Sequence, residues 1–327
     1  MKMIINRKKF LYAILMFCTL SLPFILTGSY EMILIDEVLI FVICVLGLNY
    51  ITGLTGQNNL GMGAIFGLGA YTSGLASVRL GLNPFLCIFL AILMGIIIGQ
   101  VLGRPSLRVK GIFLALTTIS FGEITRLLLT NMEGLTYGTL GLRNIPDYNI
   151  FGFKFDTPAK FYYLALVMTA ISIIICYRIV NSRWGREFRA IRDNESSMES
   201  CGINISRVKI IAFTLCSIFG SIAGALYAHL IGYIHPTDFK GDLSIKFLMI
   251  LMLGGIGSVP GIVLGALIVT ILPEWLRFMD NYYMLIFGVI LLIFAIIRPY
   301  GLISIVNDVR AYISGIIKAR KAAKEHK

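Results

Sequence analysis

The sequence predicts an all-α, polytopic integral membrane protein. Hydrophobic residues make up 57% of the chain and charged residues only 14%, and the mean hydropathy is +0.84. Such a composition is typical of a chain whose solvent is lipid. The apolar residues also form runs of roughly 17 to 25 positions, long enough as helices to cross about 30 Å of hydrocarbon. Barrel strands would instead show polarity with a period of two, so helices are the expected spans.

Eight apolar segments are expected to form spanning helices. In chain order they cover residues 10–26, 32–51, 60–78, 85–102, 111–130, 161–180, 210–231 and 282–297. A further apolar region, 243–276, is broken by glycines and Pro260 into pieces of about fourteen residues, which are too short to be ordinary spans. We expect it to form either two short crossings or one re-entrant hairpin, which gives about ten membrane segments in all.

Basic residues gather in loops that fall on one side of this arrangement. Of the 29 lysine and arginine residues, 21 lie in the stretches 1–9, 104–110, 178–209 and 298–327. The positive-inside rule makes that side the cytoplasm, so both termini are expected to be cytoplasmic, which requires an even number of crossings. The net charge of +12 therefore indicates membrane topology rather than nucleic-acid binding. Residues 1–300 are expected to form one transmembrane domain, followed by a basic cytoplasmic tail over 301–327.

The start of the chain has a second interpretation. Basic residues precede an apolar run there, as they do in a secretory signal peptide. No small-residue cleavage site follows that run, and its removal would leave an odd number of crossings. A first membrane helix is therefore the favoured interpretation.

The sequence does not favour catalysis or a bound metal. The chain has three histidines and six cysteines, and neither set has the spacing of a zinc site, a disulfide framework or a metalloprotease motif. A phosphate-binding loop ending in lysine and serine or threonine is missing, and so is a nucleophile elbow. We therefore expect a non-enzymatic protein without cofactor or metal, in which any ATP hydrolysis is performed by a partner.

Two glycine-rich stretches, 53–71 and 254–266, lie in the two halves of the chain. Unwound backbone at membrane depth is tolerated only where it is buried or faces water, and interrupted segments in both halves of a chain indicate a transport site. The candidates for lining such a site are Gln57, Asn58, Asn59, Gly254, Gly255 and Gly257. The alternatives are that glycines permit close helix packing, as the spacing of Gly95 and Gly99 indicates, and that the amides cap the following helix.

A charged pair lies within the expected helix 111–130. Glu123 and Arg126 are three residues apart, so they face the same side of the helix, and Glu123 lies near the middle of the span. Charges at that depth are costly in lipid, so the two should pair with each other or face a polar cavity. Two hypotheses follow: a buried ion pair that fixes the position of the helix, or direct contact with a polar or zwitterionic substrate.

The long polar loop 184–209 separates two apolar segments and is expected to dock a soluble partner. Arg186, Arg189 and Arg192 recur at helical spacing and predict a basic helix face. The alternative is a solvated helix that lies on anionic lipid.

Four motifs, in this order, resemble the permease subunits of bacterial branched-chain amino acid ABC importers, in particular their LivM-like members. They are GQNNLGMGAIFGLGAYTSGL (56–75), LRVKGIFLALTTISFGEITRLLL (107–129), GREFRAIRDNESSMESCGI (185–203) and SIKFLMILMLGGIGSVPGIVLGAL (244–267). The resemblance implies a subunit of the bacterial inner membrane that forms half of a translocation pathway for leucine, isoleucine and valine. The implied partners are a second, identical or different permease subunit, two cytoplasmic ATP-binding subunits and an extracytoplasmic substrate-binding protein.

The third motif corresponds, in that family, to a short coupling helix that fits a groove of the ATPase subunit. The resemblance assigns Glu195, Ser197, Met198 and Gly202 to this helix, together with the arginines of the same loop. Small alanines are usual in the family where Ser197 and Met198 stand. The docking contact is therefore expected to differ in detail.

The substrate stays open at this stage. Asn59 and Met62 stand where the family commonly has serine and a small or polar residue, and related permeases transport urea and short amides. Two alternatives belong to different classes: an ion-coupled secondary transporter with Glu123 as its coupling site, and a passive channel. A close arginine weakens both alternatives, because it keeps the carboxylate ionised.

Overall fold

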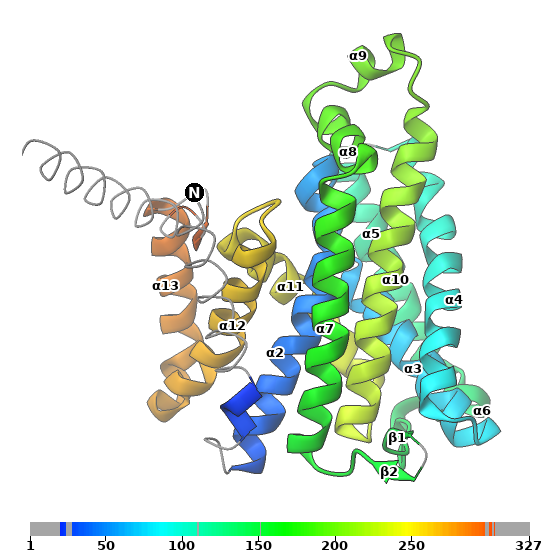
Figure 1. Ribbon diagram of the computed structural model, residues 1–327, viewed down its shortest axis with the longest axis vertical. Coiled ribbons are helices and arrows are strands. Elements are labelled where there is room, and N and C mark those ends of the chain that lie inside the picture. The colour runs from blue at the N-terminus through cyan, green and yellow to red at the C-terminus, as the bar shows by residue number, and fades with distance from the viewer. Residues whose placement is uncertain are drawn as a thin grey trace, which may run out of the picture.

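The computed structural model describes residues 20–23, 28–109, 111–150, 152–297, 301–302 and 304, and in them the chain is a bundle of helices (Figure 1). The long helices are α2 (Ser29–Leu48), α3 (Met62–Leu80), α4 (Pro84–Gly103), α5 (Ile112–Asn131), α7 (Pro158–Val180), α10 (Ile205–Ile231), α11 (Gly241–Gly254), α12 (Val259–Trp275) and α13 (Tyr283–Ile297). The shorter elements are η1 (Asn49–Thr55), η2 (Pro105–Leu107), α6 (Glu133–Thr136), η3 (Gly138–Leu140), β1 (Asn149–Ile150), β2 (Phe153–Lys154), α8 (Arg183–Asp193), α9 (Glu195–Ser200), η4 (Pro236–Phe239) and η5 (Leu276–Tyr282). Apart from the two-residue hairpin of β1 and β2, the described chain is helical, which confirms the predicted class.

Five stretches of the described chain are long and apolar enough to cross a membrane: Pro84–Leu107, Ile112–Asn131, Pro158–Val180, Ile205–Ile231 and Val259–Met279. Helices α2 and α13 also coincide with expected segments, although the first half of α2 carries three acidic residues. The expected first segment, 10–26, lies mostly outside the described residues, as do the basic residues before it and nearly all of the tail 301–327. The count of ten membrane segments therefore stays a prediction.

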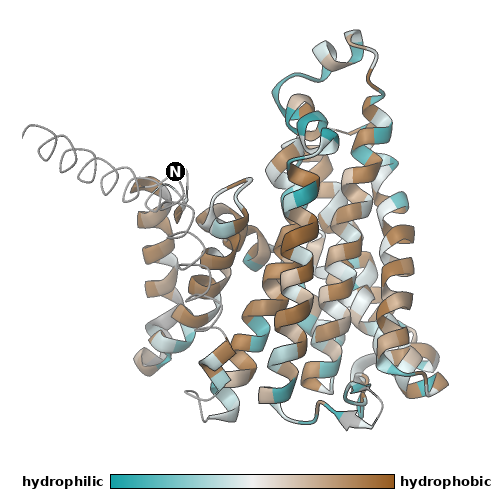
Figure 2. Ribbon diagram, viewed as in Figure 1, coloured by the Kyte–Doolittle hydropathy of each residue, from teal (hydrophilic) through white to brown (hydrophobic). Residues whose placement is uncertain are grey.

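Polar and apolar residues are separated along the bundle. Hydrophobic residues cover the middle of the helices, and hydrophilic ones gather toward both ends (Figure 2). α8 and α9 lie at one end, whereas β1, β2 and α6 lie at the other (Figure 1). At this second end Lys160 donates a 2.7 Å hydrogen bond that lowers the pKa of Asp156, and burial raises the pKa of Asp147. The loops thus alternate between two polar ends, as a chain that crosses a membrane repeatedly requires.

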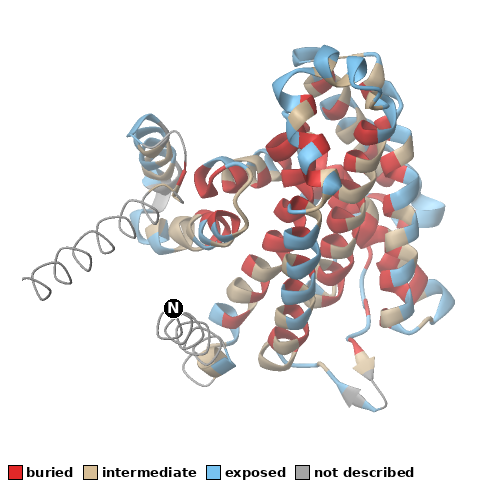
Figure 3. Cartoon of the chain, turned by 45° about the horizontal axis from the view of Figure 1, so that its top comes forward, coloured by how far each residue is buried: buried red, intermediate tan, exposed pale blue. Residues whose placement is uncertain are grey.

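Helix α2 is the centre of the core. Its residues from Ile40 to Leu48 are all buried, and it packs against α7, α10 and α12. Gly47 allows α10 to come close, because a Cβ there would lie 2.8 Å from the carbonyl oxygen of Cys216. Figure 3 shows the buried residues gathered where the helices face one another.

Helix α10 packs equally closely against α3 and α4 through glycines. A Cβ at Gly224 would lie 1.9 Å from the backbone oxygen of Phe66 in α3. At Gly99 of α4 it would lie 2.4 Å from the Cα of Thr214 in α10. The packing interpretation is therefore correct for Gly99, since small residues let helix backbones approach closely within a membrane.

The glycine-broken region 243–276 forms an antiparallel hairpin of α11 and α12. A Cβ at Gly254 would lie 2.4 Å from the oxygen of Gly261, and one at Gly261 would lie 2.1 Å from the oxygen of Gly254. Gly255, with φ of 109°, forms the turn, and Ser258 caps α12 by accepting a 3.2 Å hydrogen bond from the Gly261 N–H. With 14 residues, α11 extends about 21 Å, less than a full hydrocarbon layer.

Candidate functional site

The site begins at a π-helix that continues α2. Residues Asn49–Thr55 (η1) take the wider π-helical turn, which occurs mostly as short interruptions of α-helices and frequently at functional sites. A Cβ at position 53 would lie 2.0 Å from the side-chain oxygen of Asn49, so any residue other than glycine would displace that amide. The segment ends at Gly56, whose left-handed backbone (φ 70°) turns the chain toward α3.

Asn49 joins the two glycine-rich stretches. Its side-chain oxygen accepts a 2.9 Å hydrogen bond from the backbone N–H of Gly257 at the tip of the α11–α12 hairpin. A Cβ at Gly257 would also lie 3.8 Å from the side chain of Leu54. Gly53 and Gly257, which are more than half the chain apart in sequence, are thus brought together, and a fully buried amide holds them there.

The three consecutive amides after η1 lie in different environments. Asn59 is buried, its oxygen accepts a 2.9 Å hydrogen bond from the Gly61 N–H, and its nitrogen lies 3.8 Å from Cys216 Sγ. This position favours the structural alternative for Asn59. Asn58 is exposed and Gln57 half-buried, so these two remain the candidates for contact with solvent or substrate.

Gln57 lines a cavity of about 220 Å³ that reaches the docking loop. Its walls come from the end of η1, the start of α5 and the corner between α8 and α9, and they include Thr55, Arg192 and Glu195. The side-chain oxygen of Gln57 is buried and has no hydrogen-bond partner in the described part of the chain. The cavity therefore connects the polar end of the first glycine-rich stretch with the loop expected to bind a partner.

The three arginines of the docking loop do different things. Helix α8 buries Phe188 and Ile191, and Arg186 on its other side is exposed. Arg189 is also exposed, but it donates a 3.2 Å hydrogen bond to the carbonyl oxygen of Val180. Arg192 donates a 3.0 Å hydrogen bond to the carbonyl oxygen of Gly53 in η1. Two of the three arginines on the expected basic face therefore bind backbone carbonyl oxygens of this chain.

Helix α9 is held to α10 by an ion pair at its first residue, whereas residues farther along are exposed. Glu195 forms a 2.7 Å ion pair with Lys209, whose side chain is only 2% exposed. Ser197 and Gly202 are exposed and Met198 is half-buried. Gly202 has a φ of 76°, and the space around its Cβ position is open. The family-derived residues thus form a small protrusion at one end of the molecule, the highest point of the chain in Figure 1.

Glu123 and Arg126 form the expected ion pair, with the guanidinium Nε 3.1 Å from both carboxylate oxygens. The pair is not buried within this chain, since the Glu123 side chain is 54% and that of Arg126 22% exposed. It also lies within one helix, so it does not tie α5 to a neighbour. The hypothesis of a buried pair that fixes the helix position is therefore wrong for the isolated chain.

The same side of α5 presents a long apolar face. Its exposed large residues recur every three or four positions, together with Glu123, and are Ile112, Phe113, Leu116, Ile119, Ile124, Leu127 and Leu128. An exposed ion pair halfway along a helix of this length is costly in lipid. A second protein surface or a water-filled passage is the environment that suits both kinds of residue.

Asn49, Lys209 and the inward bond of Arg192 were not foreseen from the sequence. Asn49 gave a signal, because it is an amide at the end of a long apolar run, and buried amides need partners. Lys209 gave a weaker signal, because it is a charged residue directly before an apolar span. The partner of each is far away in sequence, which no local pattern reveals.

Comparison with known proteins gives a family match and several relatives. Residues 32–295 match the family described as branched-chain amino acid transport system permease component. The chain is 32% identical, over 97% of its length and 80% of the relative, to the high-affinity branched-chain amino acid transport system permease protein LivM of Salmonella typhimurium, and 31% identical over the same shares to LivM of Escherichia coli K12. The fructose import permease protein FrcC of Rhizobium meliloti is 27% identical over 70% of the chain and 65% of its own. No solved structure matches.

Proposed function

Because the chain belongs to the family of branched-chain amino acid transport system permease components, we propose that it forms half of the pathway by which an ABC importer takes up leucine, isoleucine and valine. It is a multi-pass membrane protein of a transport permease family. The proposed partners are a second permease subunit, identical or different, two cytoplasmic ATP-binding subunits and an extracytoplasmic substrate-binding protein. The proposed location is the bacterial inner membrane, with the α8–α9 end in the cytoplasm.

The observation that carries this proposal is the path of contacts from the docking loop to both glycine-rich stretches. Arg192 in α8 holds the carbonyl of Gly53, and Asn49 in the same π-helix holds the N–H of Gly257. A partner that moves α8 and α9 would therefore displace η1 and the hairpin tip together. Such a connection is what an importer needs if nucleotide binding in another protein is to change the shape of the pathway.

The exposed face of α5 supports the proposed pairing with a second permease subunit. An apolar face of this extent is suited to helix packing, and the Glu123–Arg126 pair on it would be shielded from lipid by a second subunit. The pair would then line the passage between the two subunits, where a zwitterionic amino acid meets both charges. The candidate pathway residues are therefore Gln57, Asn58, Glu123, Arg126 and Gly257.

The alternative functions have less support. Arg126 donates to both oxygens of Glu123, and an adjacent cation opposes the proton uptake that an ion-coupled carboxylate requires. Urea and short amides would fit a passage lined by Gln57 and Asn58, but two similarities that each cover 97% of the chain are to permeases named for branched-chain amino acids.

Replacing Ser197 by tryptophan tests the docking assignment. Ser197 is exposed on α9, so a tryptophan there is expected to leave the bundle intact. The larger side chain should prevent α9 from entering the groove of the ATPase subunit. We expect co-purification of the ATPase with the permease to fall by about tenfold or more, since a steric clash in an interface core readily costs that much. Co-purification at the wild-type level would contradict the assignment.

The matched control is Thr139→Trp, because Thr139 is exposed on the short helix η3 at the opposite end of the bundle. Both variants should reach the membrane in equal amounts, and only Ser197→Trp should lose the ATPase. Loss of the ATPase in both would mean that the added tryptophan perturbs the bundle in general.

A further inference from the structure

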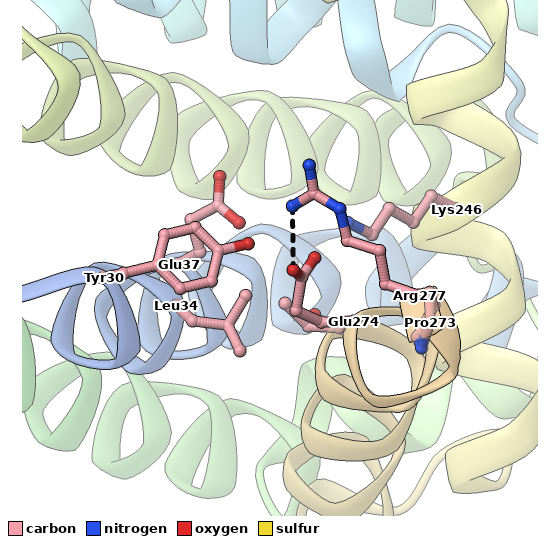
Figure 4. A pocket seen from close by; sticks show the side chains of 8 residues that line it. Tyr30, Leu34, Glu37, Lys246, Pro273, Glu274 and Arg277 are labelled. Atoms are coloured by element: carbon pink, nitrogen blue, oxygen red, sulfur yellow. Dashed lines mark hydrogen bonds and ion pairs between the residues drawn. The ribbon is translucent and has the colours of Figure 1, made fainter. Parts of the chain in front are cut away.

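A second polar cavity lies between α2, α11 and α12, away from the tip of the hairpin. It has a volume of about 420 Å³ and is lined by Tyr30, Leu34, Glu37, Lys246, Thr270, Pro273, Glu274 and Arg277. Figure 4 shows the labelled side chains converging on it. None of these residues belongs to η1, the docking loop or the exposed face of α5, so the cavity is distinct from the site described above.

The charges around this cavity are balanced but only half of them are paired. Arg277 lies 3.0 Å from Glu274, and Tyr30 lines the same cavity. Glu37 and Lys246 line the cavity as well, yet among the described residues no ion pair within 4.0 Å joins them to each other or to another side chain. Lys246 Nζ lies 4.7 Å from the centroid of the Phe41 ring, but this contact leaves the ammonium without an anionic acceptor among the described residues.

A buried hydroxyl points to an occupant of that space. Thr270 is only 4% exposed and lines the cavity, and its Oγ1 has no hydrogen-bond partner in the part of the chain that the structure describes. Buried polar atoms in folded proteins are nearly always hydrogen-bonded. A molecule that enters the cavity, whether water or a ligand, would supply the missing partner.

The lining determines which kind of molecule fits. Two carboxylates and two cations favour a ligand without net charge that nevertheless carries both signs, because an ion of one sign would meet an equal number of like charges. The volume lies in the range of small-molecule sites, and Leu34 and Pro273 supply apolar contact. Ammonium and carboxylate or phosphate groups are the charged partners that form the strongest hydrogen bonds with Glu37 and Lys246.

We propose that this cavity binds a zwitterion in which a primary ammonium contacts Glu37 and an anionic oxygen group contacts Lys246. The Thr270 hydroxyl supplies one further hydrogen bond. Two sources present this chemistry, a free amino acid and the ethanolamine phosphate headgroup of a lipid. Because binding is measured on the chain alone, the proposal stands or falls independently of the proposed transport function.

Calorimetry on the full-length chain, purified in a maltoside detergent, tests the proposal with four probes. L-leucine and sn-glycero-3-phosphoethanolamine, a phosphodiester like the lipid headgroup, carry both charges and no net charge. Isoamylamine carries only the ammonium, and 4-methylpentanoate carries only the carboxylate. We expect at least one zwitterion to bind and both single-charge probes to bind about tenfold more weakly or worse, because each lacks one charge-assisted hydrogen bond. Binding of leucine identifies a free amino acid, and binding of glycerophosphoethanolamine alone identifies a lipid headgroup.

Variants locate the binding in this cavity. Glu37→Gln and Lys246→Met should each weaken zwitterion binding by about tenfold, whereas the exposed controls Glu31→Gln and Lys240→Met should bind as the wild type does. If a charge variant does not fold, the near-isosteric Thr270→Val is expected to weaken binding by about fivefold. The proposal is overturned if neither zwitterion binds, if a single-charge probe binds equally well, or if the folded variants bind unchanged.

Discussion

Replacing Arg192 by methionine is expected to reduce leucine uptake by the assembled importer about tenfold, while ATP hydrolysis falls by less than about twofold. The variant keeps the aliphatic stem of the side chain but removes the charged hydrogen bond to the carbonyl of Gly53. Docking of the ATPase should persist, because α9 and its ion pair between Glu195 and Lys209 are untouched. The measurement is the ratio of leucine transported to ATP hydrolysed in proteoliposomes.

A double-mutant cycle with Asn49 shows whether the two bonds act as one connection. Asn49→Ala removes the acceptor for the Gly257 N–H, and it should lower uptake by a similar factor. If η1 relays the movement, the second substitution adds little to the first, since residues of one network have non-additive effects. Strictly multiplicative losses of uptake would contradict the relay. The control is Arg143→Met, because Arg143 lies in a loop at the opposite end of the bundle. An equally low ratio of leucine transported to ATP hydrolysed in this control would also contradict the relay.

The double variant Glu123→Leu, Arg126→Leu is expected to reach the membrane normally but to lose leucine uptake by at least about tenfold. The pair lies on an exposed face of α5, and its hydrogen bonds join two residues of that same helix, so its removal should not disturb the fold of the single chain. Uptake should fall because the passage between subunits loses both charges that meet the substrate. Membrane expression and initial uptake rates are the two measurements.

A matched control removes a comparable pair elsewhere. Asp156 and Lys160 are joined at 2.7 Å on the surface of the other end, and their double replacement by leucine should leave uptake within about twofold of the wild type. Full uptake by the Glu123 and Arg126 double variant would remove both residues from the pathway. A failure of that variant to insert would show instead that the pair is needed for assembly of the chain.

The helices could be predicted because each depends on its own stretch of sequence. An apolar run such as 161–180 has no alternative in lipid but to form a helix, and α7 covers it. The broken region 243–276 was predicted only in part. Gly254 and Gly261 interrupt the run and pack against each other, as a break requires. The expectation that both pieces are too short to span was wrong for the second, because the helix continues past residue 276 and Val259–Met279 is long enough to cross a membrane.

The site was predicted less completely because its connections join distant residues. The spacing of Arg186, Arg189 and Arg192 showed that they share a helix side, but not that Arg192 would bond to Gly53 rather than a partner. Likewise, the exposure of Glu123 depends on which helices cover α5. Both features are set by the packing of the bundle, which a local pattern does not contain.

Uptake of labelled leucine into proteoliposomes tests the central claim most directly. The vesicles should contain this chain with a second permease subunit, the ATPase subunits and the substrate-binding protein, each purified from the same importer. The account predicts leucine uptake that requires ATP, and that stops when Ser197→Trp prevents the ATPase from docking. Uptake driven by an ion gradient without ATP, or ATP-driven uptake that survives the loss of docking, would contradict it.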